Sequence, residues 1–164
     1  MEGNLLAAAQ DIEKLKLYAG NNSAIDLATV QEAVADSARF NVYDLADSLL
    51  NGDAAHCIRM LRGVRDEGTD AAVVHWVFRK EILLLVDLKT AINEGANPAQ
   101  AMQRCGVWKN RQHVVGNAVK RLSTKRLERA TSQLADADQA FKGAKHDDPW
   151  RIFEQIAVNL KTHS

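Results

Sequence analysis

The chain has 164 residues, 46% of them apolar and 26% charged, and its 21 Lys and Arg balance its 21 Asp and Glu. This length suits one domain or one domain with part of a second, and this composition excludes a mostly disordered chain. Two cysteines, Cys57 and Cys105, weigh against a disulfide framework and indicate a reducing compartment. The longest apolar run is residues 82–86 and the first residues lack a secretory pattern, so we expect a cytoplasmic protein that crosses no membrane.

Helical periodicity begins at the first residues. The first expected helix ends near residues 20–23, and the second begins at Asp26 or Thr29. The pattern breaks near residue 40. A short helix follows, and Gly52 just past its end is expected to stop it in a left-handed conformation.

Two further helices follow, each with a capping residue at its start. Asp53 is expected to cap a helix over residues 53–68, and Thr69 or Asp70 a long helix that reaches about residue 94. The long helix is apolar on most sides, which predicts that it is the central helix of a bundle and that Trp76 lies in the core. Residues 79–81 are expected to line its partly exposed side.

The C-terminal part of the sequence predicts shorter helices. Pro98 suits the first turn of one, and three more are expected at about residues 110–122, 124–143 and 148–162. Asp148 begins the last, in which Trp150 is expected to be a core residue. No segment shows strand alternation. The sequence therefore predicts an all-α protein, with an antiparallel helical bundle over residues 39–164 and a helical pair over residues 1–38 that belongs to another domain.

The residue patterns of common catalytic and cofactor sites are absent. No glycine-rich phosphate loop is present, and the adjacent His56 and Cys57 point about 100° apart on a helix, which does not suit a metal site. Cys57 is expected to be a small core residue, and residues 146–148 a turn and helix cap. We expect no enzyme activity, no catalytic residue, no metal and no cofactor.

A basic block is the one strong charge asymmetry. Between Gly95 and Leu127 there is no acidic residue, but there are seven basic ones: Arg104, Lys109, Arg111, Lys120, Arg121, Lys125 and Arg126. Trp108 lies among them. An exposed Trp108 would stack on an unpaired base while Arg104, Lys109 and Arg111 neutralise phosphates. Alternatively, Trp108 packs as a hydrophobic staple against the next helix, and the basic residues are a solvated face or meet an acidic neighbour.

Several segments in order carry a family resemblance: EGNLLAAAQDIEKL (2–15), VQEAVADSARFNVYDLADSLLNGDAAHCIRMLRGVRDEG (30–68), FRKEILLLVDLK (78–89) and VWKNR (107–111). They resemble the C-terminal half of the bacterial DNA polymerase III delta subunit family, part of the clamp loader. The resemblance implies that residues 1–38 end an AAA+-type helical lid and that residues 39–164 form a helical collar.

The same resemblance implies the partners. The collar would pack with other clamp-loader subunits, and primer–template DNA becomes a possible ligand of the basic block. The sliding clamp would be reached only through an N-terminal domain that this sequence is expected to lack. The alternative that remains open is a stand-alone helical nucleic-acid-binding module.

Overall fold

The computed structural model describes residues 42 and 44–162, and all regular secondary structure in that part is helical, which confirms the all-α prediction. A helical segment over residues 44–51 precedes six labelled helices: α3 (Ala54–Asp66), α4 (Ala71–Asn93), α5 (Pro98–Arg104), α6 (Gln112–Arg121), α7 (Thr124–Phe141) and α8 (Pro149–Asn159). None of these described helices has both the length and the apolar content needed to cross a membrane.

Short side chains fix most of the helix starts. Asp53 accepts a hydrogen bond from the backbone N–H of residue 56, as predicted, and Asp70 rather than Thr69 caps α4. Asn97, Ser123 and Asp148 do the same for α5, α7 and α8. Each cap satisfies a backbone donor that the helix leaves unpaired. These local bonds explain why the predicted boundaries agree with the structure to within a few residues.

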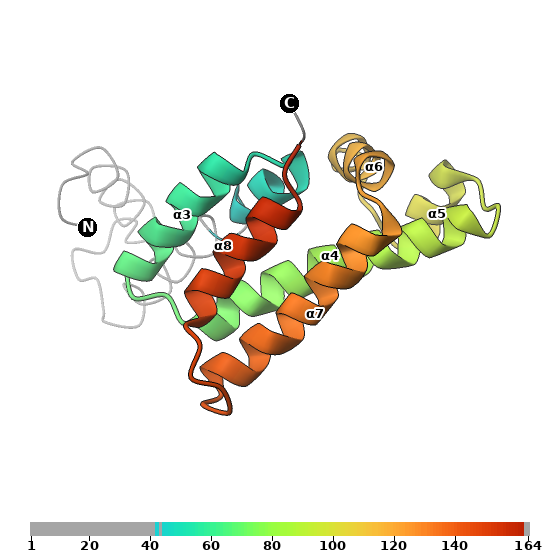
Figure 1. Cartoon of the computed structure of the whole chain (residues 1–164). Coiled ribbons are helices and arrows are strands. Elements are labelled where there is room, and N and C mark those ends of the chain that lie inside the picture. Colours follow the sequence, from blue (N-terminus) through green and yellow to red (C-terminus); the bar gives the residue numbers. More distant parts are fainter. Residues whose placement is uncertain (1–41, 43, 163–164) are drawn as a thin grey trace, which may run out of the picture. The chain divides into compact units, whose positions relative to one another are not determined.

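The long helix α4 is the element around which the others assemble. It packs along α7 and contacts α5, α6 and α8, while α8 lies between α3 and α7 (Figure 1). Its buried side chains are mostly large and apolar, and Phe78 meets Phe153 of α8 edge to face, with ring centroids 5.6 Å apart. Full burial of such a side chain contributes about 1.5–3 kcal/mol. The predicted central position of this helix is confirmed.

Two predictions on α4 were wrong. Trp76 is 54% exposed, although it was expected in the core. It lies two residues from both Val74 and Phe78, so it points about 200° away from these buried side chains. Conversely, Glu81 is buried, although it was expected on the exposed side, because it continues the buried stripe one turn after Val77. Trp150, the other expected core tryptophan, is half-buried with its edge against Phe153.

The N-terminal predictions fall outside the described residues. These are the helices ending near residues 20–23 and beginning near residue 26, and the lid assignment of residues 1–38. The described helices belong to a compact unit delimited as Tyr43–Ser164. The domain boundary between residues 38 and 39 stays a prediction.

Candidate nucleic-acid interface

The tryptophan-bearing segment begins at the end of α5, where the chain reverses through a Schellman motif. The N–H of Gly106 donates to the carbonyl of Gln103 at 3.1 Å, and that of Val107 to Met102 at 2.9 Å. Gly106 has φ +69°, the left-handed conformation that this motif requires and that glycine adopts without steric cost. The motif turns the chain away from α5 immediately before Trp108.

A second turn then presents Trp108 to solvent. The Trp108 carbonyl accepts the N–H groups of Arg111 and Gln112 at 2.9 and 3.1 Å, and the Gln112 side chain donates to the Val107 carbonyl at 3.1 Å. Both backbone and side-chain bonds therefore hold residues 107–112 in one shape. The Trp108 side chain projects from it and is 77% exposed, the largest exposure among the large apolar residues described. The indole does not pack as a buried staple on α6.

Arg111 ties this segment to two other parts of the bundle. Its Nη1 lies 3.1 Å from Glu81 Oε1 on α4, and its Nη2 lies 3.1 Å from Asp47 Oδ1 in the helical segment 44–51. The Glu81 carboxylate is buried, and its Oε2 has no partner within the described residues. Removal of Arg111 would leave a buried carboxylate unpaired, at a cost of about 1–3 kcal/mol. Arg111 therefore has a positioning role in this fold.

A groove of 520 Å³ runs between this segment and α4. Trp108 and Val107 line one side, and Lys80 and Leu84 of α4 line the other. Lys109 and Arg104 are exposed near the segment, whereas Arg111 lines the groove while paired. The structure thus brings Trp108, Lys109 and Arg111 together on one turn. Arg104 is the last residue of α5, just before this turn. Lys80 was not among the predicted site residues. It lies 28 positions before Trp108, and no local sequence pattern links the two.

The remaining basic residues divide into two groups. Lys120 and Lys125 are exposed. Arg121 donates to the carbonyl of Leu50 at 2.8 Å, and Arg126 binds the carbonyls of Asn159 and Lys161. Burial, and then the nearby charge of Arg126, lowers the pKa of Arg121. Arg121 and Arg126 thus bind backbone carbonyls near the ends of other helices. Only part of the basic block therefore faces solvent.

Cys57 and Asp148 serve structure. Cys57 is fully buried, and burial, with a smaller effect of Asp53, raises the pKa of its thiol to about 12, which disfavours a thiolate. Asp148 caps α8 and pairs with Arg65 at 2.9 Å, in agreement with the helix cap predicted there. Within residues 44–162 no cluster of His, Cys, Asp and Glu has the arrangement of a metal site.

Comparison with known proteins gives consistent matches. The family model described as processivity clamp loader gamma complex DNA pol III C-term matches residues 42–163. The DNA polymerase III subunit delta of Escherichia coli (strain K12) is 32% identical over 160 residues, which cover 97% of this chain and 46% of that protein. The subunit of the same name from Haemophilus influenzae is 24% identical over 167 residues, which cover 97% of this chain and 48% of that protein.

A solved structure has the same fold. The Bacillus subtilis DNA clamp loader delta protein matches with a TM-score of 0.59 and 21% sequence identity, over 96% of this chain and 46% of that one. The chain therefore spans about half the length of the relatives that it matches.

Proposed function

The chain belongs to the family described as processivity clamp loader gamma complex DNA pol III C-term, and on this premise we propose that it is a non-catalytic part of a DNA polymerase III clamp loader. In this role the helices of residues 39–164 form a collar that packs with other clamp-loader subunits in the cytoplasm and supports loading of the sliding clamp onto primed DNA. The observation that carries the proposal is the family match over residues 42–163, supported by relatives named as subunit delta.

We also propose a DNA contact at the segment over residues 105–111. Trp108 stacks on an unpaired base at a primer–template end, while Lys109 and Arg104 approach the phosphates. The support is the 77% exposure of the indole on a turn held by backbone bonds, next to exposed cations. A stacked base contributes about 1–3 kcal/mol. Arg111 acts in this proposal mainly by holding the turn through Glu81 and Asp47.

The Trp108→Ala variant tests the DNA contact. We expect binding to a labelled primer–template to weaken by about 5- to 150-fold, the equivalent of losing one stacked base. The thermal midpoint should change by less than about 2 °C, because the exposed indole contributes little to the core. Fluorescence anisotropy and circular dichroism measure the two quantities on the same sample.

Trp76→Ala is the matched control, since it removes another exposed indole that lies outside the 105–111 segment. Unchanged DNA affinity in Trp108→Ala, or a loss of the same size in Trp76→Ala, would contradict a specific contact at Trp108. A large drop in melting temperature in Trp108→Ala would indicate a structural role instead.

Mixing the chain with the other clamp-loader subunits tests the collar role. We expect a larger complex on a sizing column with light-scattering detection. A chain that stays monomeric in that mixture while it binds DNA tightly would favour the alternative, a stand-alone helical nucleic-acid-binding module, over the collar.

A further inference from the structure

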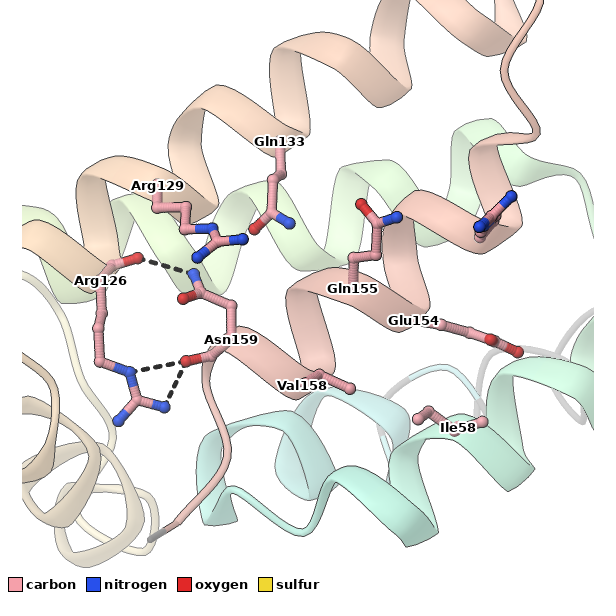
Figure 2. A pocket seen from close by; sticks show the side chains of 9 residues that line it. Ile58, Arg126, Arg129, Gln133, Glu154, Gln155, Val158 and Asn159 are labelled. Carbon is pink, nitrogen blue, oxygen red and sulfur yellow. Dashed lines mark hydrogen bonds between the residues drawn. The ribbon is translucent and has the colours of Figure 1, made fainter.

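The outer face of α8 carries a second groove, away from the tryptophan segment, with a volume of 540 Å³. Figure 2 shows that Arg129 and Gln133 reach into it from α7, while α8 contributes Gln155 and Val158 and α3 contributes Ile58. The consecutive helices α7 and α8 thus build one surface together with α3, which lies far from them in sequence. Val158, which lines the groove, is 47% exposed.

The charges on this groove are unbalanced. Glu154, the one acid that lines it, is bound by Arg62 at 2.9 Å. Arg129 and Arg151 also line the groove and are exposed, and neither forms an ion pair with any residue that the structure describes. Arg126 lines the groove as well, and it binds neutral backbone carbonyls. The groove therefore presents three positive charges that no described carboxylate neutralises, and two of them, on Arg129 and Arg151, are exposed.

The neighbouring surface limits this positive charge at one end only. Arg151 also borders a hollow lined by Asp136, Asp147 and Asp148. Asp136 is bound by Lys145 and Asp148 by Arg65, so Asp147 is the one carboxylate there without an ion pair among the described residues. The groove is accordingly positive toward Arg129 and nearly neutral beyond Arg151.

We propose that this groove, lined by Ile58, Arg129, Gln133, Arg151, Gln155 and Val158, docks an acidic segment of another clamp-loader subunit. Carboxylates of that segment bind the guanidinium groups of Arg129 and Arg151, and an apolar side chain rests on Ile58 and Val158. The inference depends on the proposed clamp-loader role. It says which surface of the chain meets another subunit and that the contacting segment is acidic.

Protein is favoured over nucleic acid as the occupant by the composition of the groove. Its cations are all arginines, which bind carboxylates through two parallel hydrogen bonds, and arginine is enriched in protein interfaces where lysine is depleted. Ile58 and Val158 add aliphatic surface, and Gln133, Gln155 and Asn159 add amides. Sites for unpaired nucleic acid combine cations with aromatic side chains on which bases stack, and none of the described residues that line this groove is aromatic.

The double variant Arg129→Glu/Arg151→Glu tests the proposal. We expect its affinity for the other clamp-loader subunits, measured by titration calorimetry and sizing with light scattering, to fall at least about tenfold, since like charges then face each other. Its melting temperature should stay near that of the wild type, because neither arginine has an internal ion pair. The milder Arg129→Lys/Arg151→Lys variant keeps the charge but loses the paired hydrogen bonds of the guanidinium groups. Its affinity should lie between that of the wild type and that of Arg129→Glu/Arg151→Glu.

Arg59→Glu is the matched control. Arg59 is an exposed arginine of α3 that does not line the groove, so its reversal should leave assembly unchanged. A photo-cross-linking amino acid at position 155 then identifies the occupant, and the cross-linked peptide should contain several Asp or Glu residues.

Each result separates this proposal from the clamp-loader role itself. Normal assembly of Arg129→Glu/Arg151→Glu, or a cross-linked segment without carboxylates, overturns the acidic docking site and leaves the collar role intact. Normal assembly with lost binding to duplex DNA would assign the groove to nucleic acid and overturn the proposal as well. A wild-type chain that binds no clamp-loader subunit contradicts the proposed function and this inference with it.

Discussion

Gly52 shows at the scale of one residue how the bundle closes its C-terminal end. Its φ is +74°, and its carbonyl accepts the N–H of Thr162 at 2.9 Å. Arg121 reaches the same place and donates to the carbonyl of Leu50 at 2.8 Å. A turn after the helical segment 44–51, the end of α6 and the chain beyond α8 therefore meet at one glycine.

Gly52→Ala should destabilise the protein by about 2 kcal/mol or more. An added Cβ would lie 2.8 Å from the backbone N of Thr162, inside van der Waals contact, and alanine is strained at this φ. Chemical denaturation followed by circular dichroism measures the loss.

The control for this substitution is Gly63→Ala in α3, where the added methyl meets no atom within 4 Å. In a helix interior that change should stabilise by about 0.5–1 kcal/mol. Equal and small effects at both positions would mean that the junction at Gly52 does not contribute to stability.

Residues with local roles could be predicted from the sequence, and residues with distant partners could not. Gly52 as a helix stop and Asp53 as a cap follow from their immediate neighbours. Arg111 was predicted as a phosphate contact from its position beside Trp108. Its actual carboxylate partners, Glu81 and Asp47, lie 30 and 64 positions away, and no local pattern reveals such pairs.

At the scale of the helix, α8 illustrates a start that depends on one side chain. Asp148 Oδ1 accepts the N–H of Trp150 at 3.0 Å, Pro149 occupies the first turn, and Asp148 Oδ2 binds Arg65 of α3. Capping and ion pairing thus come from the two oxygens of one carboxylate, which both starts α8 and anchors it to α3.

Two substitutions separate these contributions. Asp148→Ala should lower the free energy of unfolding by about 1 kcal/mol, because the cap is lost. Asp148→Asn keeps a good capping group and loses only a partly exposed ion pair, so it should cost a few tenths of a kcal/mol. Urea denaturation measures both variants, and an equally large loss in Asp148→Asn would show that the ion pair, not the cap, sets the stability of this end.

Helix faces were harder to predict than helix ends. The apolar character of α4 on most sides led to wrong predictions for Trp76 and Glu81, and the partner that accounts for the buried Glu81 carboxylate is Arg111, 30 positions away. Similarly, α6 begins at Gln112, later than expected, because residues 108–111 form a turn of their own. That turn, which exposes Trp108, was not visible in the periodicity.

At the scale of the molecule, a net charge of zero conceals how the cations are used. Seven basic residues occupy the acid-free interval of the sequence. Three of them, Arg111, Arg121 and Arg126, are bound to carboxylates or carbonyls of the chain. The other four, Arg104, Lys109, Lys120 and Lys125, are exposed. The basic block is therefore partly a structural device, which limits how many phosphates it can bind.

This division predicts a shallow salt dependence of DNA binding. Each neutralised phosphate contributes about −0.9 to the slope of log affinity against log salt, so four free cations give a slope no steeper than about −4. Anisotropy titrations of a labelled primer–template between about 50 and 200 mM salt measure it. A slope near about −6 would mean that Arg111, Arg121 and Arg126 also leave their internal partners to bind DNA, and the Arg111 ion pairs would then be a switch rather than a support. A slope within the limit keeps those arginines in the fold and leaves Trp108 to supply the specificity for an unpaired base.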